Sequence, residues 1–350
     1  MQTNIHPHLN QNLEILGLIH HHHHPNLLDA SFLSDRAKSL GINTEELYKK
    51  FAPLLKRYIA EFEKGVILKE GDSLFFEDEE SLLLLFLQIL LAQLPQWVEG
   101  IESIPEEEVR ASLLEGISEW LSTEVKPDVT PNEIIEILKT STLPSNDCWK
   151  VMLLLQHPKQ HMQHLAKIIR RHIPSYQKAL QAIEKPLTRQ MERFIKQRQT
   201  KQQQKTRQRI EEVADVIRAS TTTYTIIPTL IHPTLEIVLE DHNFVGLFTD
   251  DLYQMLENLQ KAKCGSNPVF KALSDSSKFD ILLSLNNAPK YNLELAEHLG
   301  LTAATISHHM QILLLHGLVN VEKRDGRVHY TLQKDVIKAS ISQLQETFSI

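Results

Sequence analysis

The strongest constraint on the fold lies in the last quarter of the chain. Asn292 opens an apolar helical pattern that Gly300 stops, because glycine readily takes the left-handed conformation that ends a helix. Leu301 then supplies an apolar residue, and Thr302 can cap a second helix from about Ala303 to His316. A helix, a glycine, a short turn, a cap and a second helix in this order predict a helix-turn-helix.

The second helix of this pattern divides into an apolar and a polar face. At about 100° per residue, Ile306, Met310, Leu313 and Leu314 share one face and are expected to be buried. An ordinary amphipathic helix would show the same division, but the flanking elements favour a helix that reads DNA. Small residues allow close approach to base edges, and hydroxyl, imidazole and carboxamide groups can bond to bases or phosphates. The candidate DNA-binding residues are Thr302, Ala304, Thr305, Ser307, His308 and Gln311.

A β-hairpin is predicted directly after this helix. Residues 319–324 and 327–332 alternate apolar and polar side chains on either side of Asp325-Gly326, which is a strong hairpin signal. Basic side chains gather at the tip, where they could grip phosphate or enter a minor groove. They are Lys323, Arg324 and Arg327. Basic residues on an isolated hairpin usually serve solubility, but this one follows a recognition-helix pattern, which favours a DNA-contacting wing.

The segment resembles the ArsR-type family of bacterial repressors. The matching stretches are 272–275, 278–282, 295–301, 305–313 and Gly317-Leu318, followed by the hairpin through Tyr330. The resemblance implies a winged helix-turn-helix and a homodimer on a roughly palindromic operator, with one recognition helix in each half-site. It also implies dimerisation through the last helix. The residues proposed for that contact are Ile337, Ile341, Leu344 and Phe348.

The chain departs from the family pattern in three places. Ser276-Ser277-Lys278 stands where the family often has Pro-Thr-Arg, which would adjust a helix start and a phosphate contact. Residues 290–294 lack the cysteines of the metal-sensing branches, and residues 333–350 lack the histidine of the other metal site. Family members usually have about 100 residues, a typical size for one domain. These departures therefore predict that both metal sites of the family are missing. The resemblance also leaves the large N-terminal region unexplained.

The charge of the chain is unevenly distributed. A formal net charge of −7 argues weakly against a nucleic-acid binder. By segment, however, residues 1–188 carry −8, residues 189–209 carry +7, residues 210–262 carry −7 and residues 263–350 carry +1. The basic segment is expected to be a solvated helix or a helical linker, with DNA contact as the alternative. The predicted DNA-binding domain should therefore depend on a few placed contacts rather than on bulk charge.

The rest of the sequence predicts a mainly α protein. Helical stripes fill the N-terminal part, and Leu82–Leu94 is too short to span a bilayer, which favours a buried core helix. Strand-forming residues between Thr221 and Phe248 predict a small hairpin-like β element. Four regions are expected: a helical N-terminal domain with a possible regulatory role (1–188), a basic Gln-rich helical connector (189–220), a small β element plus helix (221–262) and a winged helix-turn-helix domain (263–350).

Histidines and cysteines give little support for a metal site or an enzyme. The run His20–His24 and the set His157, His161 and His164 could bind a transition metal, but a polar tract and a solvated helix face are favoured. Two cysteines exclude a disulfide scaffold and a multi-cysteine zinc site. Phosphate-binding glycine loops and Gly-x-Ser-x-Gly or His-Glu-x-x-His motifs are absent, so neither an enzyme nor a cofactor is expected.

These observations predict a cytoplasmic, sequence-specific transcriptional regulator that binds double-stranded DNA and no membrane. A repressor is favoured, with an N-terminal region that senses a small-molecule ligand or a partner. The alternatives are a metal-responsive regulator that uses the N-terminal histidines and a catalytic domain fused to a DNA-binding module.

Overall fold

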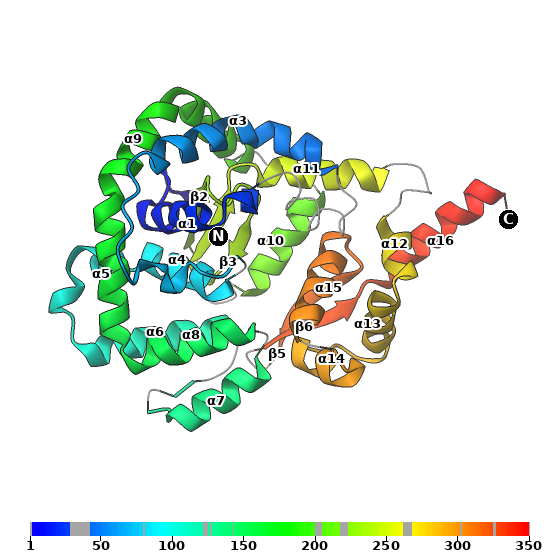
Figure 1. Ribbon diagram of the computed structural model, residues 1–350. Coiled ribbons are helices and arrows are strands. Elements are labelled where there is room, and N and C mark those ends of the chain that lie inside the picture. The colour runs from blue at the N-terminus through cyan, green and yellow to red at the C-terminus, as the bar shows by residue number, and fades with distance from the viewer. Residues whose placement is uncertain are drawn as a thin grey trace.

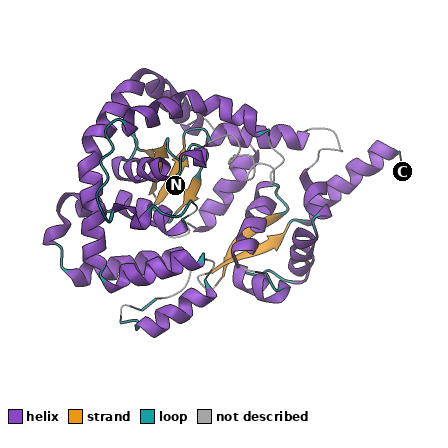
Figure 2. Cartoon of the chain, viewed as in Figure 1, coloured by secondary structure: helices purple, strands orange, loops and turns teal. Residues whose placement is uncertain are grey.

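The computed structural model describes residues 2–28, 43–79, 81–121, 125–126, 128–141, 143–199, 205–217, 223–261, 268–301, 303–324 and 327–349. The protein is mainly helical with few strands, which confirms the predicted fold class (Figures 1 and 2). The N-terminal region contains α1 (Gln11–His23), η1 (Pro25–Leu28), α3 (Thr44–Glu63), η2 (Asp72–Phe75), α4 (Leu82–Gln93), α5 (Pro95–Gly100), η3 (Ile101–Ser103), α6 (Glu106–Leu121), α7 (Pro131–Thr140), α8 (Ser145–Gln156), α9 (Pro158–Gln199), α10 (Lys205–Ile217) and α11 (Thr249–Lys261).

A four-stranded sheet lies inside this helical region (Figure 1). Its strands are β1 (Gln2–Ile5), β2 (Thr223–Thr229), β3 (Glu236–Val238) and β4 (His242–Gly246), in the order β1-β2-β4-β3. β1 and β4 pair in parallel with β2, and β3 pairs antiparallel with β4. The sheet is therefore larger than the small hairpin-like element that the sequence predicts. The first four described residues complete the sheet from the far end of the chain, and no local pattern encodes that pairing.

One apolar core runs from Leu9 to Phe248 and joins the sheet to its helices. The expected boundary at residue 188 lies within the single long helix α9, and the strands expected in a separate region pack into the same core. We propose that the sheet and the helices through α9 form one unit.

The apolar helix α4 packs against α1, α5 and α8, and most of its side chains are buried. Among the described residues, no single helix is long and apolar enough to cross a membrane. Among these residues, α4 and the segment Pro95–Ser103 have the length and composition of a membrane span only when they are taken together. The two are bent by 86° relative to each other.

The C-terminal part has the element order of a winged helix-turn-helix. It contains α12 (Pro268–Ser274), α13 (Ser276–Asn287), α14 (Asn292–Leu299), α15 (Ala303–Leu315), β5 (Val319–Arg324), β6 (Arg327–Leu332) and α16 (Lys334–Phe348). A second apolar core holds these elements together, and Ile281, Leu295, Ile306, Met310 and Leu313 are fully buried in it. α16 extends away from the rest of the protein (Figure 1).

Candidate nucleic-acid interface

The turn between α14 and α15 is built as the sequence predicts. Gly300 has a φ of 64°, in the left-handed region that glycine adopts without strain. The backbone N–H groups of Gly300 and Leu301 both donate to the carbonyl of Ala296, which closes the end of α14. Thr302 lies outside the described residues, so its expected capping role stays a prediction.

The two faces of α15 differ as expected in its first half. Ile306, Met310 and Leu313 are fully buried in the second core, and Leu314 is only half-buried. His308 and Gln311 are exposed on the other side of the helix. Thr305 and Ser307 are half-buried, and Ala304 lies in the first turn, although nothing is described of its side chain. The helix therefore presents an imidazole and a carboxamide that can reach a ligand.

Ser307 has a structural partner that sequence reasoning missed. Its hydroxyl oxygen accepts a hydrogen bond of 3.0 Å from the side-chain amide of Asn292. Asn292 is the first residue of α14, so this bond ties the two helices of the motif together. Ser307 thus fixes the position of α15, and its own O–H can still donate to a further acceptor.

Lys278, at the position where the chain departs from the family, is occupied within the domain. Its Nζ lies 2.7 Å from Oδ2 of Asp275, and the Lys278 side chain is largely buried. Asp275 also accepts from the backbone N–H of Lys278 and so caps α13. Burial lowers the pKa of the neighbouring His309 on α15, and Lys278 lowers it further. Lys278 is thus engaged in an internal ion pair, and the expected adjustment of a phosphate contact in this segment stays a prediction.

The wing is a regular antiparallel hairpin. β5 pairs with β6 from Val319 opposite Leu332 to Arg324 opposite Arg327. Lys290 adds a bridge to Tyr330 on the outer side of β6, with backbone hydrogen bonds of 3.2 and 2.8 Å. The backbones of Lys323, Arg324 and Arg327 lie at the tip, as predicted, while nothing is described of their side chains.

The stripe proposed for dimerisation lies on α16. Ile337 packs partly into the core of its own domain. Ile341 and Phe348 are 48% and 67% exposed, and Leu344 is half-buried. Three of the four side chains thus leave apolar surface that a second copy could cover.

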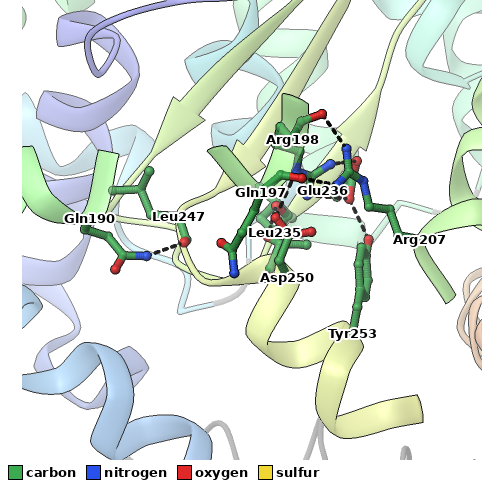
Figure 3. Close-up of polar contacts among 10 residues, drawn as sticks. Gln190, Gln197, Arg198, Arg207, Leu235, Glu236, Leu247, Asp250 and Tyr253 are labelled. Atoms are coloured by element: carbon green, nitrogen blue, oxygen red, sulfur yellow. Dashed lines mark hydrogen bonds and ion pairs between the residues drawn. The ribbon is translucent and has the colours of Figure 1, made fainter. Parts of the chain in front are cut away.

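The basic segment 189–209 makes extensive contacts within the chain (Figure 3). Arg198 has a fully buried side chain, with Nε 3.2 Å from Asp250 and Nη1 3.2 Å from Glu236. Burial alone would lower the pKa of Arg198, but the two carboxylates raise it above its ordinary value. Arg193 lies 2.7 Å from Asp251.

Arg207 adds another internal contact, because it donates to the backbone carbonyls of Gln197 and Arg198 at the end of α9. At least three cations of the segment therefore hold the fold together, and the solvated helix face that we expected describes it incompletely.

The histidines also serve internal contacts. Nε2 of His20 lies 2.8 Å from the carbonyl oxygen of Asp78, and Nε2 of His24 lies 2.7 Å from that of Phe76. His172 accepts a hydrogen bond from the backbone of Ile67. Within the part of the chain that the structure describes, no three His, Cys, Asp or Glu side chains are arranged to hold a metal ion.

Comparisons with known proteins agree with this geometry. The model of the family described as "Bacterial regulatory protein, arsR family" matches residues 275–321. The chain is 32% identical over 76 residues to the transcriptional repressor SdpR of Bacillus subtilis. The matched residues make up 22% of this chain and 84% of SdpR. The chain belongs to the arsR family of bacterial regulatory proteins.

A second arsR-type relative is the transcriptional activator HlyU of Vibrio cholerae serotype O1. It is 29% identical over 93 residues, which cover 27% of this chain and 86% of HlyU. No solved structure matches the chain significantly. The protein is therefore a DNA-binding transcriptional regulator, and the residues that match the family model, 275–321, lie in the C-terminal domain.

Proposed function

We propose that this arsR-family protein is a homodimeric regulator that reads an operator with α15 and grips flanking phosphates with its wing. The observation that carries the proposal is the exposed pair His308 and Gln311 on a helix whose opposite face is fully buried in the domain core. An imidazole and a carboxamide can both exchange hydrogen bonds with base edges in a major groove.

The same proposal gives the remaining predicted residues their roles. Ala304 and Thr305 lie in the first turn of α15, which enters the groove first in a helix-turn-helix. Ser307 positions α15 through Asn292, and the capping of α15 by Thr302, which lies outside the described residues, stays a prediction. Arg324 and Arg327 face each other across the end of the hairpin, where cations can neutralise phosphates.

Dimerisation through α16 supports the reading of a palindromic site. The exposed side chains of Ile341 and Phe348 lie about one and three turns beyond Ile337, which anchors the start of the helix in the domain core. A two-fold axis beside α16 would place one recognition helix in each half-site.

Repression is the direction that we propose, because SdpR is named a repressor; HlyU, named an activator, supports the opposite direction. A regulator of this kind acts in the cytoplasm, where bacterial DNA lies. We propose that the N-terminal region supplies its regulatory input, from a small molecule or a partner. A reporter gene placed behind the protein's own promoter distinguishes the two directions. Deletion of the gene for the regulator should raise expression of the reporter if the protein is a repressor and lower it if the protein is an activator.

The DNA contact is tested by replacing His308 and Gln311 with alanine in the full chain. Binding to the protein's own promoter region should weaken at least tenfold, while binding to random duplex should weaken less, because base contacts carry specificity. The matched control is H157A/Q160A, which removes an exposed histidine and an exposed glutamine from the N-terminal region. Equal losses on both DNAs would show that α15 contacts only the backbone.

The dimer is tested by sedimentation velocity on I341E/F348E. Two buried charges at an apolar interface should convert the dimer into a monomer. The control S342E adds a charge at an exposed position of the same helix. A dimer that survives in I341E/F348E would move the interface away from α16.

A further inference from the structure

The outward face of α15 is exposed in its first half and buried in its second half. His308, Ile312 and Leu315 are spaced i, i+4 and i+7, so they share one stripe of the helix. This stripe lies across the helix from Met310, which enters the core of the domain. His308 is exposed, whereas Ile312 and Leu315 are 3% and 8% exposed. Another part of the chain therefore covers the continuation of the face that would read bases.

The cover over Leu315 comes from α10 and α11. Leu315 belongs to a separate apolar cluster with Tyr253 and Leu256 of α11, and Ile210 of α10 packs against that cluster. α10 also packs beside α15 and along β5 (Figure 1). The same pair of helices thus contacts both elements that a winged helix-turn-helix offers to DNA, the recognition helix and the wing.

A duplex seated on α15 would meet this pair. The helix rises about 1.5 Å per residue, so Leu315 lies only about 10 Å along the axis from His308. The major groove is about 12 Å wide, and the groove that accepts His308 therefore extends over the position of Leu315. Duplex DNA and α11 would occupy the same side of the helix.

Polar contacts fasten α10 and α11 to α9 and β3 of the N-terminal region (Figure 3). The hydroxyl of Tyr253 donates to Glu236 on β3 at 2.6 Å, and the ring of the same residue packs in the cluster with Leu315. Arg207 of α10 donates to the backbone at the end of α9, and Arg198 of α9 pairs with Asp250 at the start of α11. The state of the N-terminal region is therefore connected to the recognition helix through a short chain of contacts.

We propose that this structure is a closed form, in which α10 and α11 hold the recognition helix off DNA until the cluster of Tyr253, Leu256 and Leu315 opens. The inference rests on the proposed function, since it requires that α15 reads DNA. The N-terminal region and the duplex then compete for one face of α15. A signal that loosens α11 raises the affinity for DNA, because the population shifts to the open form.

The first test is Leu256→Ala in the full chain, with fluorescence anisotropy of a labelled random-sequence duplex as the readout. Loss of a buried leucine contact weakens the closed form, so the duplex should bind roughly tenfold tighter or more. The control Leu113→Ala removes a fully buried leucine from α6, outside the cluster, and should leave affinity unchanged. Unchanged or weaker binding by a folded L256A protein would overturn the proposal.

The second test uses the unaltered protein and therefore does not depend on how L256A folds. Amide hydrogen exchange is compared with and without the same duplex at saturating concentration. Exchange in Thr249–Lys261 should become faster on binding, because the closed form must open. Slower or unchanged exchange there would mean that α11 stays in place on DNA, and the proposal would be wrong.

The triple variant L256A/H308A/Q311A separates this inference from the proposed function. On promoter DNA, if α15 reads bases and α11 blocks it, L256A should tighten binding and the triple variant should lose most of that gain. If H308A/Q311A weakens binding to promoter DNA but L256A has no effect, only the closed form fails. If H308A/Q311A has no effect on promoter DNA in either background, the proposed function fails.

Discussion

The two cores of this molecule handle polar groups in opposite ways. Within the described residues, the most deeply buried carboxylate, lysine and arginine side chains all lie before residue 258, in the region that contains the large core. The buried polar side chains of the C-terminal domain are two serines and a histidine, Ser284, His316 and Ser340. The N-terminal region therefore depends on specific partners for desolvated charges, while the DNA-binding domain depends mainly on apolar packing.

Glu14 shows what this dependence means. Its fully buried carboxylate accepts hydrogen bonds from the hydroxyls of Tyr58 and Thr229, at 3.1 and 2.7 Å. The backbone N–H groups of Leu230 and Ile231 donate to it as well, at 2.8 and 3.1 Å. One side chain of α1 thus joins α3 and the end of β2. Burial raises the pKa of Glu14 to about 7, against the lowering effect of these hydrogen bonds.

The largest effect is expected for Glu14→Ala. Four buried donors lose their acceptor at about 1–3 kcal/mol each, so the N-terminal region should lose roughly 4 kcal/mol or more. Calorimetry should show the unfolding of this region at a much lower temperature, with the C-terminal domain little changed. Glu45→Ala, at an exposed position of α3, is the control. A small effect would mean that water replaces the carboxylate.

The converse experiment is Leu295→Ala in α14. This fully buried leucine belongs to the second core, and its truncation should cost about 2–5 kcal/mol in the unfolding of the C-terminal domain. Leu283→Ala removes the same side chain at a position of α13 that is 51% exposed and should cost little. If L295A lowers the temperatures of both unfolding transitions equally, the two cores unfold as one unit. The contrast between the N-terminal region and the C-terminal domain would then have no basis.

A smaller effect is expected in the pH dependence of stability. The pKa of Glu14 is raised from 4.5 to about 7, so its proton stabilises the folded state below pH 4.5, and this contribution disappears as the pH rises to about 7. The difference in free energy of unfolding between wild type and Glu14→Gln should therefore fall by a few kcal/mol over this range.

His20 acts in the opposite direction, because burial lowers its pKa to about 4. Its contribution to stability grows as the pH rises from about 4 to 6.5. Taking the difference between wild type and E14Q in urea titrations removes this effect, since both proteins contain His20. A difference that stays constant with pH would show that Glu14 is ionised throughout.

The smallest effect is expected for Ser307→Ala, which removes the bond from Asn292 to α15. The C-terminal domain should lose about 1 kcal/mol, the usual net value of one hydrogen bond. Ser342→Ala, on the exposed surface of α16, provides the reference. Operator binding should weaken in S307A through looser positioning of α15. Unchanged stability combined with weaker binding would instead assign Ser307 a direct contact with DNA.

The comparison also explains which predictions from sequence succeeded. Gly300 and the buried positions Ile306, Met310 and Leu313 follow from helix periodicity and from the conformational freedom of glycine, which act over a few residues. Leu315, to which the sequence pattern assigned no role, shares the outward face with His308, and periodicity cannot show that α11 covers that face. The bond between Asn292 and Ser307 was missed because it joins two helices, although both residues are polar and lie near helix starts.

The N-terminal sheet and the basic segment were predicted less well for a related reason. β1 pairs with residues more than 200 positions away, and Arg198 is neutralised by Glu236 and Asp250, which lie 38 and 52 positions further along. Periodicity and composition report the neighbours of a residue in sequence. The cost of burying a charge depends on its neighbours in space.

The sequence by itself determined the order of the helix-turn-helix and wing, because caps, glycine stops, alternation and hairpin turns act locally. It also located the positive charge of the chain in residues 189–209. Only the tertiary structure decided what that charge does, by bringing acidic residues of β3 and α11 against the end of α9. It likewise decided that half of the recognition face is covered, since burial of Leu315 requires apolar side chains from a distant part of the chain.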